Sequence, residues 1–355
     1  MSGFKTPSFW YREPGSATGL TEYALFPFSI LYGAGQKMRR QLSISERVSC
    51  PVVCVGNIVA GGSGKTPSVA ALWTLILESG IAETPWILTR GYGGTLSGPV
   101  LVDPTKHRAD QVGDEPLMLA ARGMRVVVCT DRVEGAWFAI KSGADLILMD
   151  DGFQNPRLHK DFSLLVIDGV SGLGNRSLLP AGPLRAPLSV QLARTDALVV
   201  VGDGTAADPV IAAVAARGRP VFRARIVPDR LAAEALHGQR VLAFAGIGDP
   251  ARFVRTLKAS GVAVVAERTF PDHHPYTQAE LTELIAAAGE QQLRLVTTEK
   301  DLSRLRSDPA LKAMATDISG FPVTLRFEDE PGLCDFIAAR LRAASEARLP
   351  RNHHD

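Results

Sequence analysis

Cysteine is scarce in this chain, and its few positions follow no metal or disulfide pattern. Four cysteines occur among 355 residues, at Cys50, Cys54, Cys129 and Cys334. Cys50 and Cys54 are predicted to share one face of a strand, where the usual rise places them about 13 Å apart, too far for a disulfide bond. We therefore expect four reduced, buried thiols of a cytosolic protein.

A strong charge of one sign is also absent. The 39 Lys and Arg residues nearly balance the 37 Asp and Glu residues, so the formal net charge is +2. Such a chain has no strong field for nucleic acid, and we expect no nucleic-acid partner. No cleavable signal peptide, internal repeat or low-complexity segment is visible. The length and an apolar fraction of 46% suffice for two packed domains.

No apolar run is long enough for a comfortable membrane span. The strongest one, Tyr23–Gly33, is aromatic, is interrupted by Pro27 and is followed by Lys37, Arg39 and Arg40. Two interpretations stay open at this point. The segment is either a helix lying in a bilayer interface with its cations near anionic headgroups, or a helix packed on the protein's own core.

The sequence does contain strand-like apolar runs that alternate with helical patterns. This order predicts an α/β fold in which a parallel sheet carries helices on both faces. The predicted core strands are Pro51–Val55, Trp86–Thr89, Arg125–Cys129, Leu146–Met149, Leu164–Ile167 and Ala197–Val201, with helices such as Pro116–Arg122 and Glu134–Lys141 between them.

A second, smaller α/β domain is predicted after Phe222–Val227, an alternating stretch that we interpret as a linker or bridging strand. The expected organisation is an amino-terminal apolar segment (1–44), which becomes a membrane-associating segment if the interfacial interpretation holds, a core (45–220), a linker (221–235), the second domain (236–340) and a tail (341–355).

The most informative motif is a glycine-rich loop between a predicted strand and a predicted helix. It reads Gly61, Gly62, Ser63, Gly64, Lys65 and Thr66. Backbone N–H groups and the helix N-terminus attract phosphate oxygens, the lysine adds a full charge, and the threonine offers a hydroxyl to Mg²⁺. The usual pattern has glycine six positions before the lysine, where this chain has Val59, and an incidental glycine-rich turn is the alternative. We predict a nucleotide site.

A metal-bound nucleotide also needs carboxylates at the end of a neighbouring strand. Asp150 and Asp151 follow the apolar run Leu146–Met149 and precede Gly152. The alternative is a strand that simply stops at an Asp-Asp-Gly turn. Because the chain already holds the phosphate loop, we favour the metal role.

Asp114 and Glu115 precede a predicted helix at Gly113-Asp114-Glu115-Pro116. Asp114 is suited to cap that helix. It is equally suited to act as a general base toward an attacking hydroxyl. The residues alone leave both roles open.

Two histidines lie in a proline-flanked loop, Asp272-His273-His274-Pro275. A transition-metal site needs a further ligand cluster, and none is evident. A proton-handling histidine and an exposed polar loop are the two remaining interpretations.

Two long glycine-rich connections carry arginines that suit an anionic acceptor, Arg90–Gly94 and Gly172–Arg185. A third segment, Thr298–Asp301, follows a strand directly, and a charged turn is as good an interpretation of it as a role at the nucleotide.

In this order, these motifs resemble the tetraacyldisaccharide 4′-kinase (lipid A 4′-kinase) family. The resemblance covers roughly residues 20–305 and includes Val59, since this family tolerates a residue other than glycine there. Asn155 and Ala186 depart from it, because the family commonly has a histidine and an acidic residue at these places. The motifs that carry the resemblance are Gly56-Asn57 with Gly61–Pro67, Arg90–Tyr92, Gly113–Pro116, Asp150–Gln154, Leu179–Arg185, Asp272–His274 and Thr298–Asp301.

The resemblance implies a P-loop kinase that uses ATP and Mg²⁺ to phosphorylate the 4′-hydroxyl of tetraacyldisaccharide 1-phosphate, an acylated glucosamine disaccharide. It implies that the enzyme lies on the cytoplasmic face of the inner membrane, and it favours the interfacial helix. Asp114 would be the base, His273 its partner and Lys65 the phosphate-neutralising cation. Thr66, Asp150, Asp151 and Glu115 would serve the metal, and Tyr92, Gln154, Asn175 and Arg185 would contact phosphate or acceptor.

Two rival functions remain. One is a P-loop switch or assembly ATPase, in which hydrolysis is the only chemistry. The other is a small-metabolite kinase. The apolar amino end favours the lipid kinase over the second rival, and the pairing of Asp114 with His273 favours it over the first.

Overall fold

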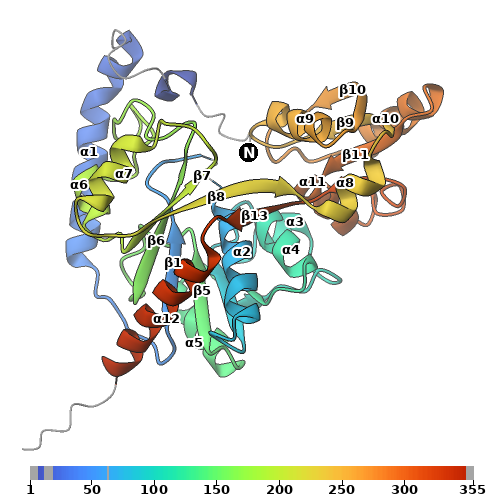
Figure 1. Ribbon diagram of the computed structural model, residues 1–355. Helices are drawn as coiled ribbons and strands as arrows, with labels where there is room; N and C mark the ends of the chain where they lie inside the picture. Colours follow the sequence, from blue (N-terminus) through green and yellow to red (C-terminus); the bar gives the residue numbers. More distant parts are fainter. Residues whose placement is uncertain (1–6, 12–18, 62–63, 349–355) are drawn as a thin grey trace, which may run out of the picture. The chain divides into compact units, whose positions relative to one another are not determined.

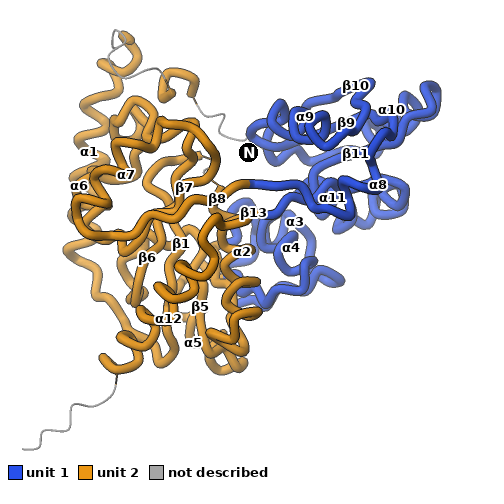
Figure 2. Tube along the Cα trace, in the orientation of Figure 1, with its two compact units in different colours: residues 1–5, 91–128, 226–324 blue, residues 6–90, 129–225, 325–355 orange. Residues whose placement is uncertain are grey.

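A computed structural model gives the fold of residues 7–11, 19–61 and 64–348, and the description below covers these residues. They group into two compact units (Figure 2). Unit 1 contains residues 91–128 and 226–324, and unit 2 contains residues 6–90, 129–225 and 325–355, within the described ranges. Residues 91–128, which were predicted to belong to the core, therefore lie in unit 1. Residues 325–340, which were predicted to belong to the second domain, lie in unit 2.

Unit 2 is built on a mostly parallel sheet with β1 near its middle, and its edge strand β13 is antiparallel to β8, as the hydrogen bonds from Asp229 N to Pro322 O and from Glu328 N to Arg223 O show. β1 pairs in parallel with β5 on one side and with β6 on the other. Every residue of β1, β2, β5, β6 and β7 is buried, which explains their nearly continuous apolar sequences. In spatial order the strands are β13 (Val323–Phe327), β8 (Val221–Pro228), β7 (Ala197–Val201), β6 (Phe162–Asp168), β1 (Val52–Gly56), β5 (Leu146–Asp150) and β2 (Pro85–Thr89).

Helices cover both faces of this sheet (Figure 1). On one face, Leu192 of α6 and Val210 of α7 pack into a core with Cys54 and Leu165 from the strands. α2 and α12 lie on the other face, where Phe336 of α12 contacts the β6 ring Phe162 at a centroid distance of 5.9 Å. The helices are η1 (Ser8–Tyr11), α1 (Leu20–Leu42), α2 (Lys65–Glu78), α5 (Arg132–Lys141), α6 (Leu188–Leu192), α7 (Asp208–Ala215) and α12 (Glu330–Glu346).

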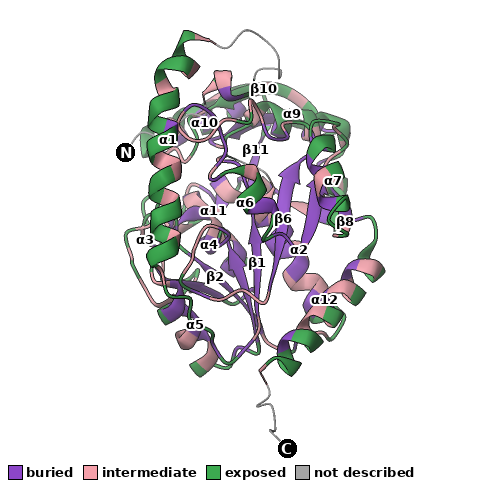
Figure 3. Ribbon diagram, turned by 90° about the vertical axis from the view of Figure 1, so that its left-hand side faces the viewer, coloured by how far each residue is buried: buried purple, intermediate pink, exposed green. Residues whose placement is uncertain are grey.

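The amino-terminal helix α1 is longer than predicted and runs through Pro27. Ser29 is its one buried residue, and most of the helix surface is exposed (Figure 3). The exposed residues include several large apolar side chains, so self-packing explains little of this helix. Within the described ranges, no helix combines the length and apolar character that crossing a bilayer requires. The exposed apolar residues of this helix are Leu20, Tyr23, Phe26, Phe28, Ile30, Leu31, Met38 and Leu42.

Unit 1 contains a second parallel sheet, in the order β10-β9-β11-β12. Alternate residues of β9 face opposite cores. Leu242 and Phe244 pack with α10 and α11, whereas Val241 and Ala243 pack with α8 and α9. The elements are α8 (Arg230–Leu236), β9 (Arg240–Ala245), α9 (Pro250–Ala259), β10 (Ala263–Thr269), α10 (Gln278–Glu290), β11 (Arg294–Thr298), α11 (Glu299–Ser307) and β12 (Ser319–Phe321).

The rest of unit 1 comes from a segment much earlier in the chain. It contains β3 (Val100–Leu101), α3 (Ala109–Val112), α4 (Asp114–Ala121) and β4 (Val126–Val128). β3 and β4 pair in antiparallel fashion. α4 is the element that brings Asp114 and Glu115 into unit 1.

The predicted α/β fold with parallel sheets is confirmed, and the predicted core strands agree with the observed ones to within a few residues. Several details were wrong. β12 and β13 were not foreseen, and α12 fills part of the segment predicted as a tail. Cys50 lies before β1 rather than in it, although burial raises the pKa of both Cys50 and Cys54 to about 12. Cys334 is only half-buried.

Candidate functional site

The phosphate loop of unit 2 has the local geometry of an anion cradle. Buried β1 leads into the loop, and α2 begins at Lys65 directly after Gly64, whose φ of 80° is a left-handed conformation that glycine adopts readily. The first turn of α2 therefore presents its free N–H groups at the end of the strand. Gly62 and Ser63 lie outside the described residues, while Gly61, with a φ of 114°, also has a backbone that favours glycine.

Two carboxylates end the strand beside this loop. Asp150 is the last residue of β5 and lies level with Val55 of β1 in the parallel register. The Asp151 carboxylate lies 3.5 Å from Lys65 Nζ and accepts a hydrogen bond from Arg185 Nη1 at 2.7 Å. Burial raises the pKa of Asp151, but the charges of Lys65 and Arg185 outweigh burial, so the pKa is lowered. This carboxylate is held ionised.

Arg185 is positioned by the loop of residues 172–185, which pairs with the chain that leads into the phosphate loop. Its N–H donates to Ile58 O, and Ala60 N–H donates to Pro183 O. Between these bonds, Val59 and Leu184 form an antiparallel bridge, and the Val59 side chain is buried in the core. A valine is thus useful at the position where the common motif has glycine.

The polar groups of Gln154 and Asn175 are engaged within unit 2. Gln154 Nε2 donates to Asn57 O at 2.9 Å, and its Oε1 accepts from Arg185 Nη1 at 3.4 Å. Asn175 Nδ2 donates to Ala181 O at 2.9 Å, inside the loop. Gln154 therefore lies beside Arg185 and Asp151, whereas Asn175 braces the loop that carries Arg185.

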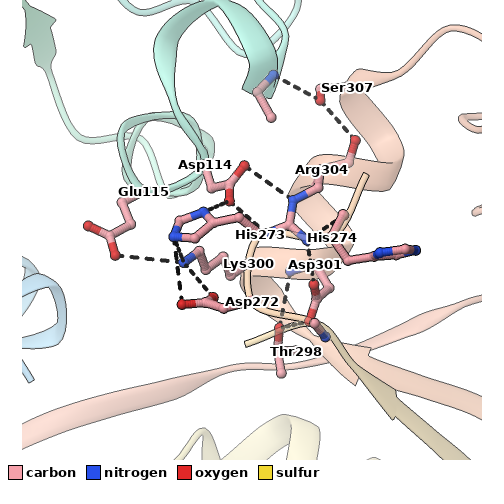
Figure 4. Close-up of polar contacts among 12 residues, drawn as sticks. Asp114, Glu115, Asp272, His273, His274, Thr298, Lys300, Asp301, Arg304 and Ser307 are labelled. Atoms are coloured by element: carbon pink, nitrogen blue, oxygen red, sulfur yellow. Dashed lines mark hydrogen bonds and ion pairs between the residues drawn. The ribbon is translucent and has the colours of Figure 1, made fainter. Parts of the chain in front are cut away.

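Asp114 in unit 1 is not the cap of its helix. The N-cap of α4 is Gly113, and Asp114 is the first residue inside the helix. Its carboxylate instead accepts a hydrogen bond from His273 Nδ1 at 2.7 Å and two from Arg304, at 2.6 and 3.2 Å (Figure 4). The capping interpretation of this residue was wrong, and the structure brings Asp114 and His273 together.

The surroundings of this pair hold Asp114 as a carboxylate. Burial raises its pKa, but the hydrogen bonds from His273 and Arg304 outweigh burial, so the pKa is well below its usual range. His273 has a φ of 59°, a left-handed backbone that is rare for residues other than glycine. Such strained residues cluster at functional sites.

The two adjacent histidines point to different partners. His274 Nε2 lies 2.9 Å from Glu280 Oε1, and its ring stacks on Phe270 at 4.8 Å. The interpretation of this loop as a metal site has no support, because no three His, Cys, Asp or Glu side chains in the described part of the chain form a metal-binding group. Of the two histidines, His273 is the one that contacts Asp114.

Charged and aromatic side chains surround the His273 ring. Lys300 Nζ lies 3.4 Å from His273 Nε2, 3.8 Å from Glu115 Oε1 and 3.7 Å from Asp272 Oδ1 (Figure 4). The Tyr92 ring lies edge-on to the His273 ring at 6.0 Å and is largely exposed. Glu115, predicted as a metal ligand, thus has a lysine beside it within unit 1.

Sequence reasoning missed Arg304 and assigned no role to Lys300. Both lie on α11, four residues apart, and therefore on one face of a helix that begins at the carboxyl end of β11. That spacing was the available signal. Arg132 was also missed: it lies at the start of α5 in unit 2, is buried, and donates from Nη1 to Cys129 O at 2.6 Å.

Comparison with known proteins gives consistent matches over almost the whole chain. The sequence profile of the family described as tetraacyldisaccharide-1-P 4′-kinase (LpxK) matches residues 21–342. A tetraacyldisaccharide 4′-kinase from Rhodopseudomonas palustris is 54% identical over 345 residues, which cover 97% of this chain and 98% of the relative. One from Nitrobacter winogradskyi is 54% identical over 333 residues, which cover 94% and 96%.

A solved structure is similar as well. The "apo" form of LpxK from Aquifex aeolicus, crystallised in complex with ATP, has 27% sequence identity and a TM-score of 0.70. The match covers 91% of this chain and 100% of the other. The similarity therefore extends through both units.

Proposed function

Because this chain belongs to the tetraacyldisaccharide-1-P 4′-kinase family, we propose that it transfers the γ-phosphoryl group of ATP to the 4′-hydroxyl of tetraacyldisaccharide 1-phosphate. The observation that carries this proposal is the 2.7 Å contact between His273 and Asp114. A kinase needs a group that accepts the proton of an acceptor hydroxyl, whereas a nucleotide switch has no acceptor to deprotonate.

The nucleotide is assigned to unit 2. Gly61, Gly64 and the first turn of α2 hold phosphate oxygens, and Lys65 neutralises the β- and γ-phosphates. Gly62 and Ser63 complete the proposed loop. A carboxylate pair one strand away from a threonine hydroxyl is a donor set suited to Mg²⁺, which would neutralise phosphate charge when bound. The proposed metal-binding side chains of unit 2 are Thr66, Asp150 and Asp151. Glu115, which the sequence alone also assigned to the metal, lies in unit 1 with Lys300 Nζ 3.8 Å from its Oε1 atom.

We assign proton acceptance to Nε2 of His273, with Asp114 as the group that orients the ring. The sequence placed the base at Asp114 itself. Three hydrogen bonds already engage both Asp114 oxygens, and its pKa is well below the usual range, so this carboxylate is a poor proton acceptor. The proposal requires that the nucleotide and this pair act on the same acceptor.

Substrate contacts are proposed for four side chains. Arg185 and Gln154 lie beside Asp151 and are assigned to transferring phosphate. Tyr92 lies against His273 and is assigned to the acceptor sugar. Asn175 is assigned an indirect part, because it shapes the loop that carries Arg185.

We propose that α1 associates with a membrane at the cytoplasmic face of the bacterial inner membrane, where an acylated acceptor would reside. Phe28 and Leu31 expose 58% and 69% of their surface in water, which is unfavourable for a helix that does not meet an apolar partner. Arg39 and Arg40 lie in the last turn of α1 and suit anionic headgroups.

The function is tested with purified protein, Mg-ATP and tetraacyldisaccharide 1-phosphate in detergent micelles. We expect phosphate on the disaccharide, and we expect ATP consumption to require the acceptor. Acceptor-independent hydrolysis without phosphorylated lipid would overturn the proposal in favour of a switch ATPase. Transfer to small soluble sugars alone would point to a metabolite kinase.

Membrane association is tested by co-sedimentation with anionic vesicles. The double variant Phe28→Glu, Leu31→Glu is expected to bind at least about tenfold more weakly, because two buried apolar side chains contribute several kcal/mol in an interface. Leu231→Glu is the matched control, since Leu231 is 75% exposed on α8. Equal binding by all three proteins would refute the role of α1.

A further inference from the structure

Arg304 binds the Asp114 carboxylate side-on. Its Nη2 donates to Asp114 Oδ2 at 2.6 Å and its Nε to Oδ1 at 3.2 Å (Figure 4). The two side chains expose only 10% and 9% of their surface, so water screens the pair little. A two-point contact fixes the plane of the carboxylate as well as its position.

The same guanidinium also holds the backbone next to His273. Arg304 Nη1 donates to the carbonyl oxygen of His274 at 3.1 Å. This carbonyl belongs to the residue that follows His273, whose left-handed φ of 59° needs support from its surroundings. Arg304 therefore fixes both the hydrogen-bond acceptor of the His273 ring and the chain that carries the ring.

Arg304 is itself held rigidly. Nη1 donates to Asp301 Oδ1 at 2.8 Å, one turn earlier on α11. Asp301 is fully buried and accepts further hydrogen bonds from Thr298 Oγ1 at 2.7 Å and Gly246 N at 3.0 Å. The guanidinium is thus anchored to β9 and β11 of its own unit before it reaches Asp114.

The charge of Arg304 has a consequence for the ring. A carboxylate that stays ionised only accepts hydrogen bonds, so His273 presents Nδ1–H to Asp114, and in the neutral ring this leaves a lone pair on Nε2. Lys300 Nζ, which only donates, lies 3.4 Å from that Nε2 atom. Asp114 and Lys300 favour the same tautomer. Asp272 Oδ2 also faces Nε2, at 3.8 Å, and Lys300 Nζ is the nearer of the two groups.

We propose that Arg304 is a positioning residue, which fixes the orientation and the tautomer of His273 through Asp114. This inference rests on the proposed function of the pair. It assigns Arg304 no contact with nucleotide or acceptor.

The test compares Arg304→Gln with Arg122→Gln. Arg122 is a matched control, because its Nε donates to Glu299 Oε1 of α11 at 2.7 Å and thereby also joins α4 to α11, yet it does not contact Asp114. We expect Arg304→Gln to lower kcat by about 10- to 100-fold, the scale of misplaced general-base catalysis, and to leave the KM for ATP within about twofold. Arg122→Gln should change kcat by less than about threefold.

Two further measurements separate positioning from a general structural effect. Arg304→Gln added to Asp114→Asn should cause little further loss of kcat, because both changes break one chain of contacts. Arg304→Lys, which keeps the charge but loses the two-point contact, should recover part of kcat. In proteins labelled with ¹⁵N-histidine and assigned with His273→Gln, the His273 signals should report Nδ1–H in the wild type and a tautomer mixture in Arg304→Gln.

The outcomes are distinguishable. If the wild type itself transfers no phosphate, the proposed function fails. If the wild type is active and Arg304→Gln matches either the wild type or Arg122→Gln in kcat, or if its effect adds fully to that of Asp114→Asn, the positioning role is refuted. If Arg304→Gln does not fold, Arg304→Lys decides: a wild-type tautomer and kcat in that variant also refute the role.

Discussion

The two candidate site regions of this protein differ in whether backbone groups or side chains form them. In unit 2, a strand, a loop and a helix follow one another within residues 52–78, and mostly backbone groups create the anion cradle. In unit 1, side chains make the site, and Asp114 lies 159 residues from His273 and 190 from Arg304 in the chain. A backbone cradle is local and tolerant of its surroundings, whereas a side-chain network depends on the whole unit.

The largest effect is expected from a substitution that breaks the hydrogen-bond network of Asp114, His273 and Arg304 in unit 1. We predict that Asp114→Ala lowers kcat at least about 10²-fold. We also predict a loss of about 3 kcal/mol in stability, because the buried Arg304 loses its partner. Steady-state kinetics and urea unfolding measure the two effects, and hydrogen exchange should accelerate in α4 and α11. Wild-type turnover would return Asp114 to a purely structural role.

Lys65→Ala should reduce activity to a similar extent while sparing the fold. The lysine supplies the one full charge of the cradle, and we predict that kcat falls at least about 10²-fold. Its ion pair with Asp151 spans 3.5 Å and is partly exposed, so the stability cost should stay below about 1 kcal/mol. A large drop in the urea midpoint would contradict the distinction between the two regions.

Arg185→Ala is expected to have an intermediate effect, about tenfold in kcat, because a contact to transferring phosphate is lost while the cradle persists. Arg219→Ala is a suitable control. Arg219 also forms an ion pair with an aspartate of unit 2, Asp196, at 3.0 Å, but this aspartate is not one of the proposed site residues. Equal activities of the two variants would remove Arg185 from the site.

The smallest expected effect is the acid sensitivity of unit 1. The folded-state pKa of Asp114 is lowered, so its stabilising contribution is complete above the ordinary value of about 3.9 and declines as the pH falls toward the folded value. The difference in unfolding free energy between wild type and Asp114→Asn should therefore shrink by about 1 kcal/mol from pH 7 to pH 3. Urea titrations at both pH values measure it, and a constant difference would argue against an ionised, paired Asp114.

The same contrast explains what the sequence could reveal. Lys65 and Thr66 are recognisable because strand, loop and helix are adjacent in the chain, and Asp150 is recognisable because a strand ends there. Asp114 was ambiguous, since a capping aspartate and a catalytic one look alike until the partner of the carboxylate is known. Arg304 depends on how α11 docks against α4, and no local pattern encodes that contact.

Other misses have similar causes. The chain first completes the four-stranded sheet of unit 1, and then β13 and α12 return to unit 2. The order of elements along the sequence does not indicate that the chain returns to its first unit. The choice of His273 over His274 was correct for the contact with Asp114, but it depends on the left-handed backbone at position 273, which sequence patterns do not indicate for histidine.

The late return of α12 also affects how this protein is made. Arg340 Nη2 in α12 donates to Asp196 Oδ1 at 2.8 Å, and Arg348 Nη2, just after α12, donates to Asp161 Oδ2 at 2.5 Å. These bonds join the α12 segment to the residues that precede β7 and β6, which leave the ribosome much earlier. At ordinary rates of translation, on the order of ten seconds separates residue 225 from residue 346. During that time α2 already lies on this face of the sheet, but the part that α12 covers is exposed, and a ribosome stalled within unit 1 would leave that apolar surface open to chaperones or to aggregation.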